Sequence, residues 1–317
     1  MMTKHLICSS LLLLTANAVQ AEGNPYDTAP VWSSDGKIIY FYSYRHGAAE
    51  LYRMNADGSN QTRLTETDHN EWWPYTVPAE RKVIVTSDRD SGGNFKGSNL
   101  YLFDLDTREM ENLTNVPEGH WAARADIAMD ANQMIYTVAE NFSAPEQEIY
   151  IMELATGKKA LYGDNPAHAN TNPAITADGS KVAYASKRDG LVGLYLNDDS
   201  GKNERLFMTF EGSNPLVRFS PDGEWLAFTL SSTARVQLEG GTNIAERDIY
   251  LAKLDGSEIK RLTITPGSDH GASWSPDGKT ITFASYRHGP SDIFAISPDG
   301  GHERNLTRTS IGHQGND

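Results

Sequence analysis

The chain has 317 residues, 38% of them hydrophobic, and a formal net charge of −14 at pH 7. Nucleic acids and anionic membranes are bound by clustered Lys and Arg, so this charge argues against both as partners. Length alone predicts about two domains, but the repeats described below predict one continuous domain instead.

The first 21 residues have the pattern of a secretory signal peptide. Lys4 gives a positive start, Leu6–Leu14 form an apolar core, and small residues end at Ala21. The apolar stretch is shorter than the roughly 20 residues that a membrane-spanning helix needs. We therefore expect cleavage after Ala21 and a mature chain, residues 22–317, that is periplasmic or secreted. Cleavage would remove Cys8, the only cysteine, and with it any disulfide or thiol site.

An aliphatic residue followed by an aromatic one recurs six times along the mature chain. The aromatics are separated by 49, 49, 45, 55 and 44 residues. The six pairs are Leu51-Tyr52, Leu100-Tyr101, Ile149-Tyr150, Leu194-Tyr195, Ile249-Tyr250 and Ile293-Phe294. A repeat of this length with strand-like composition is typical of a β-propeller, in which each repeat is one four-stranded blade. We predict an all-β fold with six blades of four antiparallel strands.

The sixth repeat shows the four expected strands most clearly. The innermost strand and its Asp-Gly turn occupy residues 272–278, and the next strands are predicted at 280–285, 292–296 and 304–307. Asp and Gly tolerate the positive φ angles of a tight hairpin, so the turn joins the first two strands directly. The fifth repeat differs by a large insertion at residues 231–246.

The sixth repeat also resembles a known family. Trp274–Lys279, Phe283–Arg287, Asp292–Phe294 and the final Asn-Leu-Thr at 305–307 are similar to the repeat of the TolB-type propellers. The resemblance implies a propeller that serves as a scaffold, as a transport-associated protein or as an accessory domain of an enzyme. TolB itself carries an α/β domain ahead of its propeller and acts in the Tol–Pal envelope system. Here the first blade strand follows shortly after the predicted cleavage site, so we expect that domain to be absent.

Histidines recur where an outermost strand leads to the next innermost strand. In a propeller these connections run toward the central channel, and imidazole is the commonest metal ligand. The sequence therefore predicts a metal or acidic-ligand site at the channel mouth. The predicted metal ligands are His69, His120, His168 and His270, with His313 in the same type of segment. The predicted ligand-binding neighbours are Glu71, Trp73, Trp121 and Arg124. The alternative is that each His is a turn residue copied with the repeat.

A Ser-x-Arg sequence follows the second strand in four repeats. The four arginines are Arg45, Arg89, Arg188 and Arg287. A guanidinium is a planar fork of donors suited to carboxylates. Each Arg is expected to pair with a nearby Asp or Glu at a turn or between blades. The alternative is a ring of cations that faces an acidic partner.

Two enzyme classes have similar propellers. Oligogalacturonate lyases, as a family, hold a divalent metal with histidines at the propeller centre, and the segment from His270 to Gly278 resembles their approach to an inner strand. That family has more blades than the six counted here. No Gly-x-Ser-x-Gly sequence occurs, and we expect no catalytic domain after the repeats, which counts against a prolyl-oligopeptidase-like hydrolase.

These observations favour a monomeric binding or scaffold protein that holds an envelope protein or a carbohydrate on one propeller face. A metal-dependent polysaccharide lyase or hydrolase at the histidine-rich mouth is the alternative function, with a divalent metal as its cofactor. The C-terminal tail, residues 312–316, repeats the connection to an inner strand. We expect it to fold over the mouth and help to close the ring near Tyr26.

Overall fold

The computed structural model describes most of the mature chain. The described residues are 26–78, 81–92, 97–141, 144, 146–163, 169–198, 203–210, 215–237 and 243–308, without the side chains of 169, 231–237 and 243–246. The signal peptide predicted at residues 1–21, His168, His313 and the tail predicted to close the ring lie outside the described residues.

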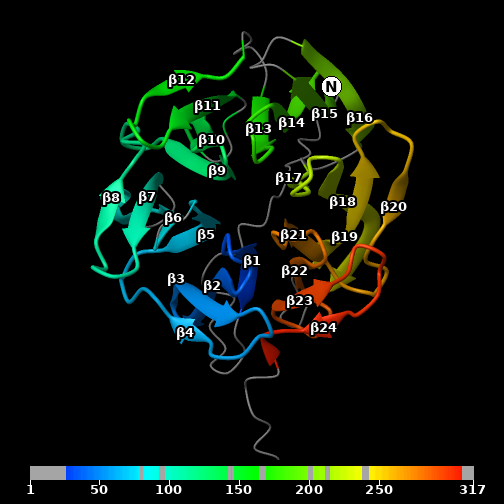
Figure 1. The fold of residues 1–317 in the computed structure, drawn as a ribbon, viewed down its shortest axis with the longest axis horizontal. Helices are drawn as coiled ribbons and strands as arrows, with labels where there is room; N and C mark the ends of the chain where they lie inside the picture. Colours follow the sequence, from blue (N-terminus) through cyan, green and yellow to red (C-terminus); the bar gives the residue numbers. More distant parts are fainter. Residues whose placement is uncertain are drawn as a thin grey trace, which may run out of the picture.

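The chain folds as a six-bladed β-propeller, as the repeats predict. Six four-stranded antiparallel sheets stand around a central axis (Figure 1). Each sheet is built from four strands that are consecutive in the sequence. Among the described residues a short 3-10 helix, η2 (Arg89–Ser91), lies in blade 2.

The strands of the first three blades follow the chain from the innermost strand to the outermost. Blade 1 consists of β1 (Asp27–Trp32), β2 (Ile38–His46), β3 (Ala48–Asn55) and β4 (Thr62–Arg63). Blade 2 consists of β5 (Glu71–Thr76), β6 (Lys82–Ser87), β7 (Asn99–Asp104) and β8 (Met110–Asn112). Blade 3 consists of β9 (Trp121–Ala128), β10 (Gln133–Ala139), β11 (Gln147–Glu153) and β12 (Lys159–Leu161).

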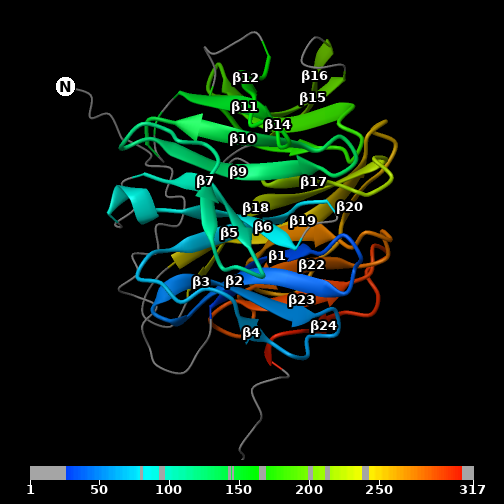
Figure 2. The same cartoon turned by 60° about the vertical axis from the view of Figure 1, so that its left-hand side comes forward.

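The other three blades have the same order. Blade 4 consists of β13 (Ala169–Ile175), β14 (Lys181–Arg188), β15 (Leu191–Asp198) and β16 (Asn203–Phe210). Blade 5 consists of β17 (Val217–Phe219), β18 (Trp225–Gln237), β19 (Asn243–Lys253) and β20 (Ile259–Arg261). Blade 6 consists of β21 (Asp269–Trp274), β22 (Ile281–Ser285), β23 (Asp292–Ile296) and β24 (Arg304–Asn305). The six innermost strands surround the centre of the disc (Figures 1 and 2).

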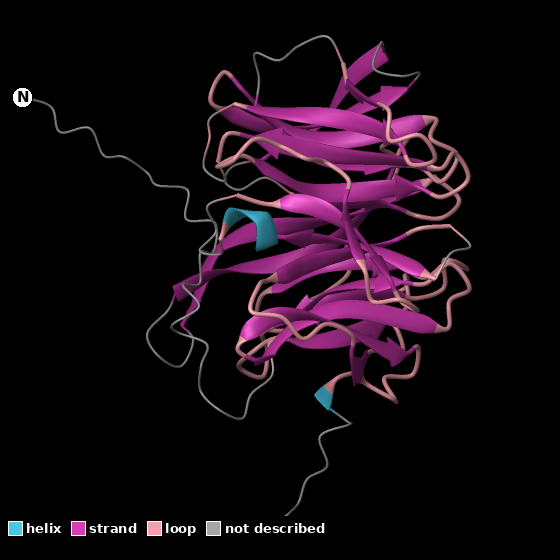
Figure 3. Ribbon diagram, turned by 90° about the vertical axis from the view of Figure 1, so that its left-hand side faces the viewer, coloured by secondary structure: helices cyan, strands magenta, loops and turns pink. Residues whose placement is uncertain are grey.

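The two faces of the disc differ because the strands within a blade alternate in direction. We call one face the turn face, because it carries the hairpin turns, mostly Asp-Gly, that join first and second strands. In the turn at Gly36, for example, φ is 69° and Asp35 accepts a hydrogen bond from Ser33. The mouth face carries the starts of the innermost strands, the connections between second and third strands, and η2 (Figure 3). The insertion of repeat five also lies there, as an extension of the β18–β19 hairpin.

The hydrophobic core lies between the blades. Each large cluster joins strands of two neighbouring blades; Tyr75, Ile84 and Leu100 of blade 2, for example, pack with Met134 and Tyr136 of blade 3. Because each sheet is buried by its neighbours, no blade is stable alone.

The ring closes where blade 6 meets blade 1, without exchange of a strand. Phe41 and Met54 of blade 1 pack against Ile293 and Leu306 of blade 6. The backbone N–H of Asp27 donates to the carbonyl of Ser291 at 2.8 Å.

In three of the four blades that carry it, the recurrent Ser-x-Arg sequence forms an ion pair with the innermost strand of the same blade, which we call the inner ion pair. The Arg45 guanidinium donates to both carboxylate oxygens of the fully buried Asp27, at 2.6 and 3.1 Å, and stands 5.1 Å from the centre of the Tyr52 ring. The same arrangement recurs as Arg89–Glu71 over Tyr101 and as Arg287–Asp269 over Phe294.

Blade 4 has Asn170 at the position of the acid, and Arg188 pairs instead with Glu204 on β16. The predicted pairing with a nearby acid is confirmed, within blades rather than between them. It also explains why the repeat keeps an aromatic residue on the third strand.

The Leu-Thr sequence that ends four of the repeats also makes contacts within its own blade. In blade 1 the Thr65 hydroxyl donates to the buried Glu50 carboxylate at 2.5 Å and accepts from the backbone N–H of Leu51 at 2.9 Å. Thr114, Thr263 and Thr307 accept the equivalent bond in blades 2, 5 and 6. These bonds attach the outermost strand to the third strand, so this part of the repeat is structural.

Candidate functional site

The innermost strands carry a ring of specially placed residues around the channel. In five blades the pairing of the first two strands shifts at one point, and the residue there has a positive φ between 44° and 68°. These residues are Ala29, Trp73, Arg124, Asn172 and Gly271. The register of β17 with β18 puts Leu216 at the equivalent position in blade 5. We call these six residues the bulge ring. A bulge redirects side chains at the rim of a barrel-like structure, and a bulky residue such as Trp at positive φ is strained.

Members of the bulge ring contact one another along blades 2 to 4, and the last of them, Asn172, also reaches blade 5. The Arg124 guanidinium stands 5.6 Å from the Trp73 ring centre and donates to the Asn172 side chain at 2.6 Å. Asn172 in turn donates to the carbonyl of Pro215 at 3.0 Å. The contacts run from one blade to the next, so these side chains line the channel.

Deeper along the same strands a second polar contact crosses the channel. Arg218 on β17 donates to the carbonyl of Ala125 on β9 at 3.3 Å and lies 3.8 Å from the Asp126 carboxylate. Blade 4 separates these two blades in the ring, so the guanidinium bridges non-adjacent innermost strands. Burial raises the pKa of Asp126, while Arg218 opposes that shift.

An aromatic arc lines the mouth on blades 6, 1, 2 and 3. Successive rings lie 5.5 to 6.5 Å apart. In order around the mouth they are His270, Tyr286, Tyr26, Tyr44, Tyr42, Trp73, Trp72 and Trp121. Tyr26, Tyr44, Trp73 and His270 are half-buried, and the other four are buried. Aromatic rings with part of their surface exposed are typical of binding surfaces for proteins and ligands.

Hydrogen bonds hold this aromatic arc in place across blade boundaries. The Trp72 indole N–H donates to the Tyr44 hydroxyl at 2.9 Å, and the hydroxyls of Tyr26 and Tyr286 bond to each other. Burial raises the pKa values of all three tyrosines, so they remain protonated donors at neutral pH. Tyr44 and Tyr286 are the middle residues of two Ser-x-Arg sequences, which places them on the mouth face.

One arginine stands at the end of the arc without a carboxylate. Arg247 on β19 is half-buried; its Nε atom is buried and unbonded, and no carboxylate in the described part of the chain lies within ion-pair distance. Burial lowers the pKa of Arg247. Burial raises the pKa of Tyr26 and lowers the pKa values of His270 and Arg124; the charge of Arg247 opposes the first shift and adds to the other two.

His270 is held neutral beside that charge. Burial, with a smaller contribution from Arg247, lowers its pKa to about 3. The ring stacks on Tyr286 at 5.5 Å, and its Nε2 atom lies 3.2 Å from the Thr28 hydroxyl.

The predicted ligand-binding residues are only partly brought together. Trp73, Trp121 and Arg124 meet around the mouth through Trp72, as described above. Glu71 is fully buried, and its carboxylate accepts from Arg89 at 2.9 Å and from Thr67 at 3.1 Å. Burial raises the pKa of Glu71 to about 7 despite the opposing effect of Arg89. We assign Glu71 to the inner ion pair of blade 2.

The predicted metal ligands occupy two different positions. His69 and His120 lie just before β5 and β9, whereas His270 is the second residue of β21. Measured from the bulge ring, His69 and His120 each come four residues before Trp73 and Arg124, but His270 immediately precedes Gly271. Among the described residues no group of three or more His, Cys, Asp and Glu is placed to hold a metal ion. Because His168 lies outside the described residues, the predicted metal site stays a prediction.

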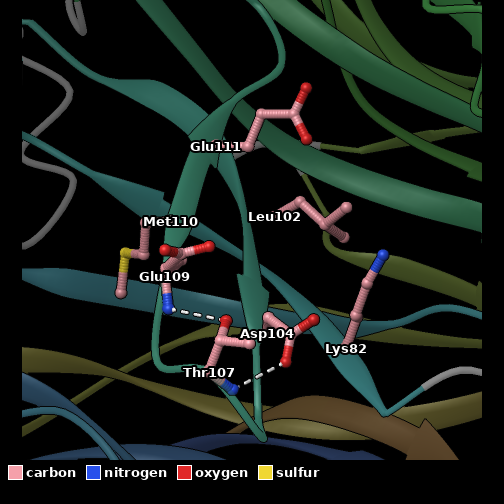
Figure 4. Close-up of a pocket in the computed structure, with 7 residues that line it drawn as sticks. All are labelled: Lys82, Leu102, Asp104, Thr107, Glu109, Met110 and Glu111. Carbon is pink, nitrogen blue, oxygen red and sulfur yellow. Dashed lines mark hydrogen bonds between the residues drawn. The ribbon is translucent and has the colours of Figure 1, made fainter.

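Two hollows lie away from the channel. One, of about 530 Å³, lies along the outer strands of blade 2, between Lys82, Asp104 and Glu111 (Figure 4). The bonds around it, from Thr107 to Asp104 and from Glu109 to Thr107, are those of the β7–β8 turn. The second, of about 240 Å³, lies on the mouth face and includes Asp90, Asn112 and His120. Neither has the convergent, partly exposed aromatic and cationic groups of the channel mouth.

Sequence reasoning missed Tyr26, Trp72, Arg247 and Tyr286. Two features of the sequence could have indicated the tyrosines as residues of the mouth. Tyr44 and Tyr286 are the middle residues of Ser-x-Arg sequences, and Tyr26 directly precedes Asp27, the acid of the first inner ion pair. Arg247 gives no comparable signal, because the residue two before the aliphatic of the third strand is Ala49, Ser98 or Ser291 in other repeats and no motif includes it.

Comparison with known proteins agrees with this architecture. The TolB beta propeller domain family matches residues 206–316. The chain is 29% identical over 234 residues to the Tol-Pal system protein TolB of Bordetella pertussis, which covers 60% of this chain and 49% of that protein. The crystal structure of TolB from Acinetobacter baumannii superposes with a TM-score of 0.63 at 18% identity, over 90% of this chain and 63% of that one. The chain folds as a propeller similar to that of TolB.

Similar propellers also occur in enzymes. The TolB-like chain is 27% identical over 306 residues, 90% of its length, to dipeptidyl-peptidase 5 of Porphyromonas gingivalis, of which it covers 41%. An oligogalacturonate lyase in complex with manganese superposes with a TM-score of 0.58 at 15% identity, over 86% of this chain and 90% of that one. The chain spans about half the length of the curated relatives it matches. Within the described ranges no helix is long and apolar enough to cross a membrane.

Proposed function

We propose that this TolB-like propeller is a binding or scaffold protein of the cell envelope that holds a protein or carbohydrate partner at its channel mouth. The observation that carries the proposal is the aromatic arc, in which four partly exposed rings and two half-buried arginines converge on one face. Aromatic and Arg side chains in largely desolvated positions supply most of the binding energy at typical interfaces. The strained backbone at Trp73 and Arg124 supports the same conclusion, because such strain concentrates at functional sites.

The direct test compares the two faces in the cell. A photo-crosslinking amino acid is placed at Lys187, exposed at the mouth-face end of β14, and in a second protein at Lys279, exposed on the turn face. Both changes remove one lysine, so the charge change is matched. We expect a discrete crosslinked partner from position 187 only. Crosslinks of equal yield from both positions, or from position 279 alone, would refute the proposal.

The envelope location is part of the proposal and is tested separately. The apolar pattern of residues 1–21 and the likeness to TolB support it. Cell fractionation followed by N-terminal sequencing of the mature protein should find a periplasmic or secreted chain that begins at Glu22. Recovery in the cytoplasm with Met1 intact would contradict it.

The metal-dependent lyase is the second candidate function. It is supported by the predicted histidine set and by the fold that the chain shares with an oligogalacturonate lyase. Metal analysis of the purified chain, with thermal melts before and after chelation, tests it. One divalent ion per chain, lost together with stability in a His168→Ala variant, would favour the lyase, and polygalacturonate cleavage would then be assayed. A metal-free chain with an unchanged melt would reject it.

A further inference from the structure

The aromatic arc ends at a place where the bulge ring has its smallest members. Blades 2 to 4 contribute Trp73, Arg124 and Asn172 to the ring, whereas blades 1 and 6 contribute Ala29 and Gly271. These two lie side by side, since a Cβ at Gly271 would stand 3.8 Å from the Cα of Ala29. The ring therefore has the least side-chain bulk next to Tyr26 and His270.

The charge at this place is unbalanced. Three of the four Ser-x-Arg arginines pair with a carboxylate of the same blade's inner strand, and the fourth pairs with Glu204. Arg247 has no such partner in the described part of the chain, and its Nε hydrogen is buried without an acceptor. A buried donor and charge without a partner are costly for stability. Such a residue is expected where a ligand supplies the partner.

The neighbouring groups can donate to an anion. The bond between the Tyr26 and Tyr286 hydroxyls uses one hydroxyl proton and leaves the other available, because each hydroxyl carries one donor. His270 next to them is neutral and stacked on Tyr286. No acidic side chain bonds to any of these three residues in the described structure.

We propose that Arg247, with the Tyr26–Tyr286 hydroxyl pair, binds a carboxylate that the partner inserts into the channel mouth. The guanidinium fork matches the two oxygens of a carboxylate. The adjoining aromatic arc then accommodates an apolar or aromatic group attached to that carboxylate. This inference rests on the proposed function, since it names the group of the partner that the mouth recognises.

The test uses benzoate as the probe and benzamide as its uncharged counterpart, by calorimetric titration of the full mature chain at low ionic strength. We expect benzoate to bind at least about tenfold more tightly than benzamide, which is the range of a charge-assisted hydrogen bond. Arg247→Gln should abolish that preference, and Arg247→Lys should keep part of it. Arg81→Gln, which removes an equal charge from an exposed pair with Asp106, should change nothing.

Stability gives a second readout. Without ligand, Arg247→Gln should melt at the same or a higher temperature than the wild type, because it removes a charge that has no partner. Benzoate should raise the melting temperature of the wild type but not of Arg247→Gln. Equal binding of benzoate and benzamide, no binding of benzoate at millimolar concentration, or an unchanged preference in Arg247→Gln would each overturn the proposal.

In a protein partner the carboxylate can belong to the C-terminus or to an acidic side chain. A peptide that ends in a free α-carboxylate is compared with a C-terminally amidated peptide that carries an internal Glu; the tighter one identifies the source. This experiment needs no natural partner, so its failure is separable from failure of the proposed function. Benzoate binding without a crosslinked partner at position 187 would leave the carboxylate site standing and remove the proposed function.

Discussion

Removal of Arg45 should strongly destabilise the propeller, although its side chain is partly exposed. The Asp27 carboxylate has no exposed surface, and both its oxygens accept from the Arg45 guanidinium. In Arg45→Met the aliphatic part of the side chain is kept and the charge is lost. Breaking a buried pair on one side costs about 3–5 kcal/mol of unfolding free energy. At about 2–4 °C per kcal/mol for a large domain, the melting temperature should fall by roughly 6–20 °C.

Urea unfolding measures the loss of unfolding free energy in Arg45→Met, and two further variants serve as controls. Arg81→Met breaks an exposed pair of similar length, 2.9 Å, and should cost about 0–1 kcal/mol. The double variant Asp27→Asn with Arg45→Met should regain much of the lost stability, because no buried charge is left unpaired. Equal losses in Arg45→Met and Arg81→Met would refute the account of the inner ion pair.

The stability of Arg45→Met should depend on pH, because the variant leaves the Asp27 carboxylate without its partner. Burial raises the pKa of Asp27, and Arg45 opposes that shift, so the pKa rises further when Arg45 is removed. An acid whose pKa is higher in the folded state than in the unfolded state loses stability as pH rises. The deficit of Arg45→Met should therefore be smallest in acid and should grow toward neutral pH. A deficit that is independent of pH would contradict this reasoning.

Two further predictions concern the outer strand and the mouth. Thr65→Val should lower the free energy of unfolding in urea by about 1–3 kcal/mol, because it leaves Glu50 and the N–H of Leu51 without their shared partner. Thr62→Val, at an exposed site, should change it by no more than about 0.5 kcal/mol. Equal losses in the two variants would contradict a structural role for Thr65. The low pKa of His270, about 3, means that the unfolded chain takes up a proton below about pH 6.5 while the folded chain does not. Stability should thus fall between pH 6.5 and 4 by more in the wild type than in His270→Asn, and parallel pH profiles would show that His270 is not the group responsible.

The fold could be predicted from sequence because each repeat contains its own structural chemistry. The Asp-Gly turns fix the first hairpin, and the aromatic of the third strand packs under the Arg of the second. The predicted third strand of blade 6, residues 292–296, is found with the same bounds. The Ser-x-Arg pairing could be anticipated for the same reason, since acid and base lie on neighbouring strands of one blade.

The site could be predicted only in part because it is built between repeats. Trp73 and Arg124 were predicted from their place near an inner strand. Their contact depends on bulges with positive φ, which Trp and Arg rarely adopt, so the sequence did not predict it. His270 was grouped with His69 and His120 as a residue of the channel mouth, whereas the strand register places it three residues nearer to the bulge position than they are. Arg247 acts on groups of blades 1, 3 and 6 from a third-strand position that holds Ala49, Ser98 or Ser291 in other repeats, so the repeat pattern does not indicate a role for it.

The measurement that tests the central claim most directly is the affinity of the partner captured at position 187 for two tryptophan variants. Trp73→Ala removes a partly exposed ring from the mouth, and Trp225→Ala removes a similarly exposed ring on the turn face, where Lys253 and Lys260 flank it. The account predicts a loss of about 2 kcal/mol or more, roughly 30-fold in affinity, for Trp73→Ala alone. An unchanged affinity in Trp73→Ala, or an equal loss in Trp225→Ala, would contradict it.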